Sequence, residues 1–210
     1  ISHVTDKLLI LLRARGYSLN KVADFHAIQQ IKEKFCYVAM DAKKENRLAD
    51  ETTCLMEKYK LPDGRVIRFD RERFQAAEVL FSPPDSDMLG VADMLFDMIQ
   101  HKAAMDLRSR LYRQVVLSGG STMYPGFSTR LHHDVQQSYL REVLKGNKSR
   151  LSNFKLRIED PPRRKHMVFM GASVYAKLMA ERHDFWMSRA EYAEEGGERL
   201  VQRKLGRLVL

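Results

Sequence analysis

A short apolar run that leads into a pair of glycines constrains the fold of this chain more than any other feature. Residues 114–117 read Gln-Val-Val-Leu, a pattern typical of a buried strand, and Gly119 and Gly120 follow almost at once. Helical spacing then resumes, with apolar side chains at Phe127, Leu131, Val135 and Tyr139. Because helix and strand patterns also alternate elsewhere in the sequence, this strand, loop and helix predict an α/β fold.

The glycine pair is a candidate ligand loop. In an open α/β sheet, ligands bind beyond the carboxyl ends of the strands. Glycines there allow a ligand to approach the backbone closely, and the amides at a helix start favour anions. The segment nevertheless matches neither G-x-x-x-x-G-K-[ST] nor G-x-G-x-x-G. The residues alone therefore leave two interpretations open, a ligand loop and a tight turn without a ligand.

Local signals predict several further elements. The chain should open with a helix that Thr5 caps and Gly16 ends, and a second helix should span about residues 26–40. The Pro62-Asp63-Gly64 turn, which lies between β-prone residues 52–59 and 65–69, predicts a hairpin. In the second half we expect helices at 91–100, 105–111 and 169–179 and a strand at 154–158. A further helix should open with a capping box at Ser188 and Glu191 and end at Gly196 and Gly197.

Composition excludes several functional classes. A hydrophobic content of 44% and a charged content of 30% are ordinary for a soluble globular protein. No apolar run approaches the length of a membrane span. Cys36 and Cys54 lack C-x-x-C spacing, which argues against a disulfide framework or a zinc site and favours a reducing compartment. His132 and His133 would point about 100° apart on a helix, so no metal site is predicted.

Positive charge is concentrated in residues 141–166. This block has nine Lys or Arg residues against three acids, a balance of 9 − 3 = +6 within a chain of net charge +9. Nucleic acid, an acidic membrane and an acidic protein surface could each meet such a block. It lacks interleaved aromatic residues and any nucleic-acid-binding motif, so we expect a solvated or protein-facing surface and no nucleic-acid partner.

Residues 117–126, reading LSGGSTMYPG, resemble the actin family. Further stretches agree and fall in the family's order, namely residues 15–18 (RGYS), 31–39 (IKEKFCYVA), 61–64 (LPDG) leading to 72–74 (ERF), 161–165 (PPRRK) and 191–192 (EY). The resemblance covers essentially the whole chain. It implies the C-terminal half of the actin-like ATPase fold that actin shares with Hsp70 and the sugar kinases. The sequence begins at Ile1 and enters a helix almost directly, which also leads us to expect a fragment.

The resemblance implies a division into three parts. Residues 1–88 would form subdomain 4, residues 89–166 subdomain 3, and residues 167–210 the C-terminal part of subdomain 1. The phosphate-binding hairpins and the catalytic residues of the family would lie outside this sequence. We therefore expect no catalytic residue here, and whether the chain counts as an enzyme stays open, although the family has slow ATPase activity.

The resemblance also implies a nucleotide site of eight residues, namely Lys32, Glu33, Gly119, Gly120, Ser121, Met123, Tyr124 and Lys165. The first two would lie beside the adenine and ribose. The glycines and the serine would approach the sugar and phosphates, and Met123 and Tyr124 would flank the base. Lys165 would come from the opposite wall. The implied cofactor is ATP or ADP with Mg²⁺ or Ca²⁺, the cation being held mainly by the missing half.

Residues 139–154 form an insertion relative to conventional actin. With an altered C-terminal tail, it favours an ATP-binding, actin-related subunit of the complex that nucleates branched actin filaments. Expected partners are a second actin-related protein, the other complex subunits, the actin filament and nucleation-promoting factors, in the cytoplasm at the actin-rich cortex. Arg141, Lys145 and Lys148 are the hypothesised partner contacts. A polymerising actin and a nuclear actin-related protein of a chromatin complex remain as alternatives.

Overall fold

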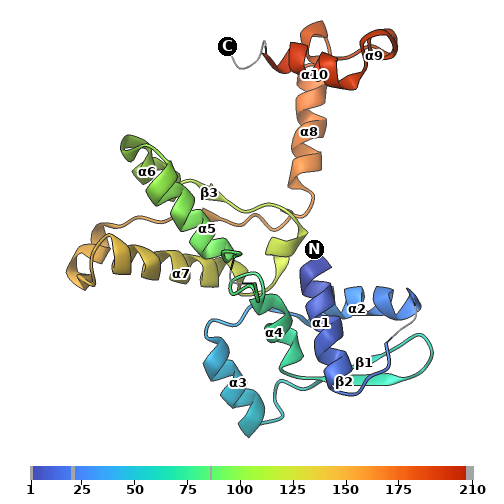
Figure 1. The fold of residues 1–210 in the computed structure, drawn as a ribbon, viewed down its shortest axis with the longest axis vertical. Helices are drawn as coiled ribbons and strands as arrows, with labels where there is room; N and C mark the ends of the chain where they lie inside the picture. Colours follow the sequence, from blue (N-terminus) through green and yellow to red (C-terminus); the bar gives the residue numbers. More distant parts are fainter. Residues whose placement is uncertain (1, 20–21, 86, 207–210) are drawn as a thin grey trace. The chain divides into compact units, whose positions relative to one another are not determined.

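A computed structural model of the chain describes residues 2–19, 22–85 and 87–206 (Figure 1). The chain forms two compact units, Ile1–Lys165 and His166–Leu210. The chain combines helices with strands, as the α/β prediction requires, and that prediction is confirmed. The finer division into residues 1–88, 89–166 and 167–210 stays a prediction.

Helix α1 (Ser2–Ala14) packs against α2 (Val22–Phe35) and α4 (Glu72–Glu78). Its stripe of buried side chains includes Leu8 and Leu12, and Gly16 follows it with a φ of +99°, as expected of a helix stop. The prediction that Thr5 caps this helix is wrong. Thr5 lies inside α1 and is buried, because the helix already begins at Ser2.

The second helix is displaced relative to its prediction of about 26–40. It begins at Val22 and ends at Phe35, whereas Val38 and Ala39 are buried in an extended segment beyond it. The Val38 amide donates to the Pro125 carbonyl at 2.9 Å. The apolar spacing past residue 35 therefore arises from a loop that packs on the core, not from a helix.

Helix α3 (Ala42–Glu51) was not predicted from the sequence. Asp41 is its N-cap, and the side chain accepts hydrogen bonds from the Lys43 and Lys44 amides at 3.0 and 3.2 Å. None of its residues is buried. The helix consequently shows no apolar stripe, which is the signal that sequence reasoning depends on.

The predicted hairpin is present. Strands β1 (Glu57–Lys60) and β2 (Val66–Phe69) are antiparallel, and Ile67 and Phe69 of β2 are buried. In the turn, the Leu61 amide donates to the Arg65 carbonyl at 2.8 Å, and Gly64 has a φ of +90°. The first strand is shorter than the predicted range of residues 52–59.

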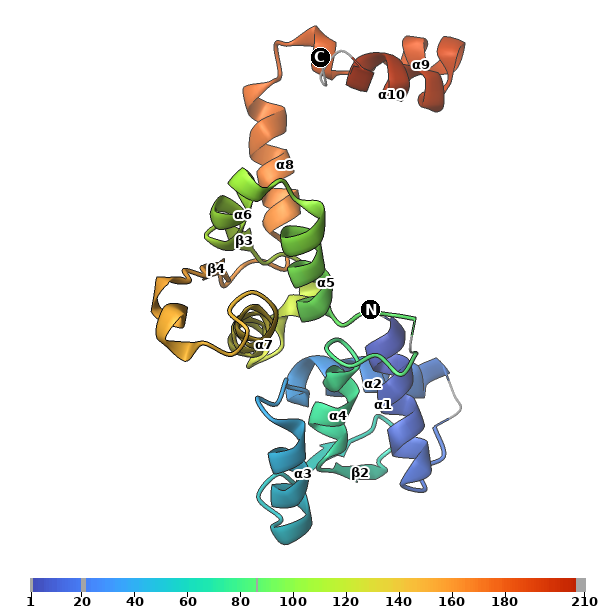
Figure 2. The ribbon, with the colours of Figure 1, turned by 60° about the vertical axis from the view of Figure 1, so that its left-hand side comes forward.

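The second part of unit 1 contains a small parallel sheet. Helix α5 (Val91–Asp97) continues as the π-helix η1 (Met98–Lys102) and is followed by α6 (Met105–Tyr112). Strand β3 (Val115–Val116) pairs in parallel with β4 (Ile158–Glu159). Helix α7 (Phe127–Glu142) packs against α5 (Figure 2). The 3₁₀ turns η2 (Gly120–Met123) and η3 (Lys148–Asn153) lie on either side of α7 in sequence.

Two strand predictions in this region need correction. Val116 is exposed, so residues 114–117 do not form a fully buried strand, because β3 pairs with a single strand among the residues that the structure describes. Residues 154–157 precede β4 and do not belong to it. Both strands are only two residues long.

Unit 2 is helical. It contains α8 (Met167–Leu178), η4 (His183–Phe185), α9 (Arg189–Glu195) and α10 (Gly197–Gly206). The predicted capping box is confirmed, since Ser188 accepts from the Glu191 amide and Glu191 accepts from the Ser188 amide. Gly196, with a φ of +75°, separates α9 from α10.

An ion-pair cluster joins the end of α1 to the region after β2. Arg15 lies 3.0 Å from Asp70 and 2.9 Å from Glu72. Burial by itself would raise the pKa of Asp70, but hydrogen bonds from Arg15 and from the Arg71 amide, with the charge of Arg15, hold it below its ordinary value. A carboxyl whose pKa is lower in the folded chain stabilises it above the unfolded pKa and loses that effect as pH falls.

We therefore predict that the free energy of unfolding decreases as pH falls below about 4, the unfolded pKa of Asp. Because Arg15 and Asp70 are partly exposed, their share should be only about 1 kcal/mol. Denaturant titrations of the wild type and of Asp70→Asn at several pH values measure the contribution of the ion pair to the free energy of unfolding. The variant should lose part of the pH dependence, and an unchanged profile would contradict the prediction.

Candidate functional site

Unit 1 contains a cavity of about 400 Å³ formed by three segments distant in sequence. The end of α2, the glycine loop with η2, and the residues that follow β4 all contribute to it. It is lined by seven of the eight predicted residues: Lys32, Glu33, Gly120, Ser121, Met123, Tyr124 and Lys165. The structure thus brings into one cavity side chains and backbone that span the whole of unit 1.

Gly119 is the predicted residue that does not line the cavity. It has a φ of +94°, a conformation that favours glycine, and an added Cβ would meet nothing within 4 Å. Its amide donates to the Arg164 carbonyl at 3.0 Å, and its carbonyl accepts from the Thr122 hydroxyl at 2.8 Å. Gly119 therefore shapes the loop, and its neighbour Gly120 presents backbone to the cavity.

The two charged residues of α2 differ in environment. Lys32 is 5% exposed, and its Nζ donates to the Thr5 hydroxyl at 3.1 Å. Glu33 is largely exposed, and its Oε2 lies 3.8 Å from Nζ of Lys165. A long ion pair between exposed groups contributes little to stability. Glu33 and Lys165 can consequently turn toward a ligand at small cost.

Met123 and Tyr124 supply an apolar wall. Tyr124 is 9% exposed, and burial raises the pKa of its phenol above the ordinary value. Met123 is more exposed and has a flexible, polarizable side chain. Such a wall suits the face of a flat aromatic ring.

Arg164 holds the glycine loop in place, and sequence reasoning did not identify it. Its guanidinium donates to the hydroxyl and the carbonyl of Thr122 at 3.0 and 2.8 Å. It also donates to the carbonyls of Asp160 and Pro161 at 3.0 and 3.2 Å. The buried side chain thereby ties the glycine loop to the segment after β4. The sequence signal for Arg164 was its place beside Arg163 and Lys165 in a basic run. That run did not show which of the two arginines is buried.

The chemistry of the cavity suits a nucleotide. Glu33 can accept hydrogen bonds from sugar hydroxyls, the apolar wall can cover a base, and Lys32 and Lys165 can donate to ring or phosphate acceptors. Among the described residues, no group of three or more His, Cys, Asp or Glu side chains could hold a metal ion. The lining residues of the cavity thus supply donors, an acceptor and an apolar surface.

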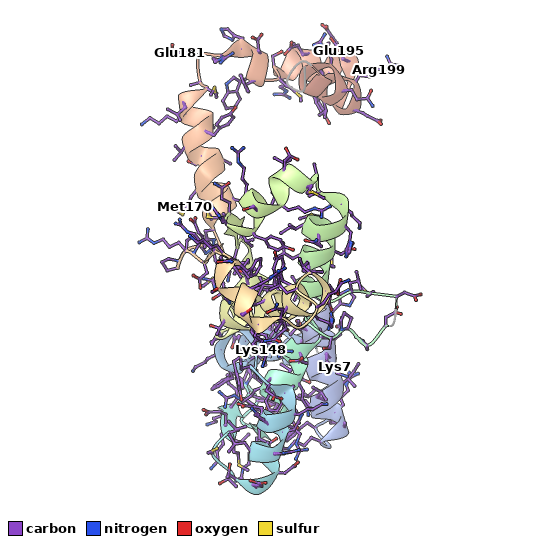
Figure 3. The ribbon with its side chains drawn as sticks, turned by 90° about the vertical axis from the view of Figure 1, so that its left-hand side faces the viewer. Lys7, Lys148, Met170, Glu181, Glu195 and Arg199 are labelled. Carbon is purple, nitrogen blue, oxygen red and sulfur yellow. The ribbon has the colours of Figure 1, made fainter. Side chains whose placement is uncertain are left out.

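The hypothesised partner contacts lie outside this cavity. Arg141 is near the end of α7, Lys145 follows with a φ of +48°, and Lys148 begins η3; all three are exposed. Figure 3 marks Lys148 in this segment. The Gly146 amide donates to the Leu140 carbonyl at 2.9 Å, which fixes the chain after the helix.

In the part of the chain that is described, no helix combines the length and apolarity needed to cross a bilayer.

Comparison with known proteins gives consistent results. The actin family model matches residues 7–206. Actin-related protein 2 of Acanthamoeba castellanii is 53% identical over 195 residues, which cover 92% of this chain and 50% of the relative. Actin-related protein 2 of Arabidopsis thaliana is 53% identical over 196 residues, with the same coverage. The chain spans about half the length of the curated relatives it matches.

Proposed function

Since this chain belongs to the actin family, we propose that it is part of an ATP-binding, actin-related subunit of the complex that nucleates branched actin filaments. With a second actin-related protein, it would provide the first subunits of a daughter filament. The observation that carries the proposal is that seven of the residues expected to contact the nucleotide line one cavity. The 53% identity to proteins named actin-related protein 2 supports the choice within the family.

The proposed ligand is ATP or ADP together with Mg²⁺ or Ca²⁺. This chain would hold the adenine and ribose and approach the phosphates, while other parts of the protein would supply the metal ligands and the catalytic groups. Nucleotide-dependent closure would then present the subunit to its partners at the cytoplasmic actin cortex. The proposed partners are the second actin-related protein, the other complex subunits, the actin filament and nucleation-promoting factors.

We predict that Glu33→Ala in the full-length protein weakens nucleotide affinity by about three- to tenfold. The variant removes an acceptor for ribose hydroxyls, and a hydrogen bond of this kind contributes about 0.5–1.5 kcal/mol. Fluorescence titration with a labelled ATP analogue measures the change. Glu51→Ala, at an exposed position at the end of α3, is the matched control. Equal affinity in the two variants would remove Glu33 from the site.

We predict that reversing the charges of Arg141, Lys145 and Lys148 to Glu weakens complex assembly without unfolding the chain. All three side chains are exposed, so the fold should tolerate the change, while an acidic partner surface would be repelled. A pull-down of the complex subunits measures assembly. Reversal of Lys43, Arg47 and Lys58, which are exposed elsewhere on unit 1, controls for net charge. Unchanged assembly of the first variant would exclude this role for the insertion.

The proposed function is tested by mass spectrometry of what co-purifies with the tagged full-length protein from its own cells. A second actin-related protein with a fixed set of partner subunits is the expected result. Recovery of chromatin-remodelling subunits, or of actin alone, would overturn the proposed function and leave the family assignment intact.

A further inference from the structure

A buried lysine at the wall of the cavity makes its hydrogen bond to a residue of another helix. Lys32 comes from α2 and is 5% exposed, and Thr5 comes from α1 and is 1% exposed. The Lys32 Nζ and the Thr5 hydroxyl oxygen are 3.1 Å apart. Lys32 lines the cavity, whereas Thr5 does not. Thr5 thus contacts a residue of the cavity wall without lining the cavity itself.

The hydroxyl satisfies only part of the hydrogen-bonding capacity of Lys32. An ammonium group has three donors and no acceptor, and one hydroxyl oxygen takes one of them. Within residues 2–19, 22–85 and 87–206, no carboxylate forms an ion pair with Lys32. Buried polar groups are normally satisfied by partners. The remaining donors are therefore suited to acceptor atoms of a molecule that enters the cavity.

We propose that Thr5 is a positioning residue for nucleotide binding, which fixes the ammonium of Lys32 at the cavity wall with its remaining donors toward the ligand. The ligand class is an adenine nucleotide, so this inference rests on the proposed function. Without the hydroxyl, the four-carbon stem of Lys32 would leave the ammonium in several positions, and the ligand would have to select one of them. Affinity would fall because that ordering is then added to the cost of binding.

The same contact links the cavity to α1. Val4 and Leu8, on either side of Thr5 in α1, are buried in the core, so the hydroxyl is held by a packed helix. A nucleotide that restrains Lys32 also restrains Thr5 and the first turns of α1. Because coupling between two sites is reciprocal, nucleotide binding should stabilise α1 as much as α1 stabilises binding.

The test is nucleotide titration of Thr5→Val in the full-length protein. Valine keeps the shape of threonine and removes the hydroxyl, so we expect ATP and ADP affinity to fall on the order of tenfold, as for loss of a hydrogen bond to a charged group. Thr5→Ser, which restores the hydroxyl, should bind nearly as the wild type does. Thr129→Val, at an exposed position on α7, is the matched control.

A second background separates positioning from a general structural effect. In Lys32→Met, the ammonium is gone, so adding Thr5→Val should produce no further loss of affinity. A merely structural role for Thr5 would give the same loss in both backgrounds. Hydrogen exchange supplies an independent measurement: nucleotide should slow exchange in residues 4–12 of the wild type but not of Lys32→Met.

Each outcome has a distinct meaning. If the wild type binds nucleotide and Thr5→Val binds it equally well, the inference is wrong and the proposed function stands. An equal loss in the wild-type and Lys32→Met backgrounds also overturns the inference. If Thr5→Val does not fold, the exchange measurement decides instead: slower exchange in residues 4–12 of both the wild type and Lys32→Met would overturn the inference. If the wild type binds no nucleotide, it is the proposed function that fails.

Discussion

Replacing Arg164 with alanine should weaken nucleotide binding by at least about tenfold and lower the free energy of unfolding by about 2–4 kcal/mol. Arg164 donates four hydrogen bonds, two of them to Thr122 in the loop that carries Gly120 and Ser121. The variant leaves the acceptors on both sides without their donor and releases the loop from the segment after β4. The expected loss of affinity follows from loop disorder, because Arg164 itself does not line the cavity.

Two neighbouring changes make this expectation specific. Arg163→Ala removes the same charge from an exposed position next to Arg164. It should change neither the nucleotide affinity nor the free energy of unfolding by much. Arg164→Lys keeps the charge but loses the planar fork that reaches several acceptors at once, so it should behave more like alanine than like the wild type. Nucleotide titration and chemical denaturation measure the two effects. Similar results for Arg163→Ala and Arg164→Ala would contradict the positioning role of Arg164.

The sequence predicted those elements whose stability comes from a patterned contact with the core or from local turn chemistry. The helix after the glycine loop shows buried side chains at Phe127, Leu131 and Val135, and the hairpin turn has Gly64 where a positive φ is required. The prediction failed in two situations. Val38 continues the apolar spacing of the helix before it, but it is buried as part of a loop. Helix α3 has no buried residue, so its sequence has no apolar stripe that could predict it.

The candidate site was predictable by resemblance and not from the residues alone. The eight predicted residues lie in three short stretches, and physical reasoning left the glycine loop open between a ligand site and a turn. The residues that hold the site in place could not be identified from the sequence. Thr5 was interpreted as a helix cap, and Arg164 was one of two adjacent arginines; only the folded chain shows which side chain meets Lys32 and which meets Thr122.

A second arginine, Arg130, also connects several segments of the chain, in this case near α4 and α7. Arg130 in α7 lies 3.0 Å from Glu78 at the end of α4 and 2.7 Å from Asp134 one turn along its own helix. It also donates to the Ala39 carbonyl at 2.7 Å, and its guanidinium lies 5.2 Å from the centre of the Phe81 ring. Its side chain is only 13% exposed. One cation therefore joins α7 to two segments from the first ninety or so residues of the chain.

Arg130→Met should lower the free energy of unfolding by about 3–5 kcal/mol, since it leaves two poorly exposed carboxylates without their cation. Denaturant unfolding measures the loss, and Arg141→Met, at an exposed position on the same helix, is the control. Adding Glu78→Gln and Asp134→Asn to Arg130→Met should restore part of the stability, because the cost lies mainly in the unpaired charges. If the triple variant is no more stable than Arg130→Met, the loss comes from packing against Phe81 and the electrostatic explanation is wrong.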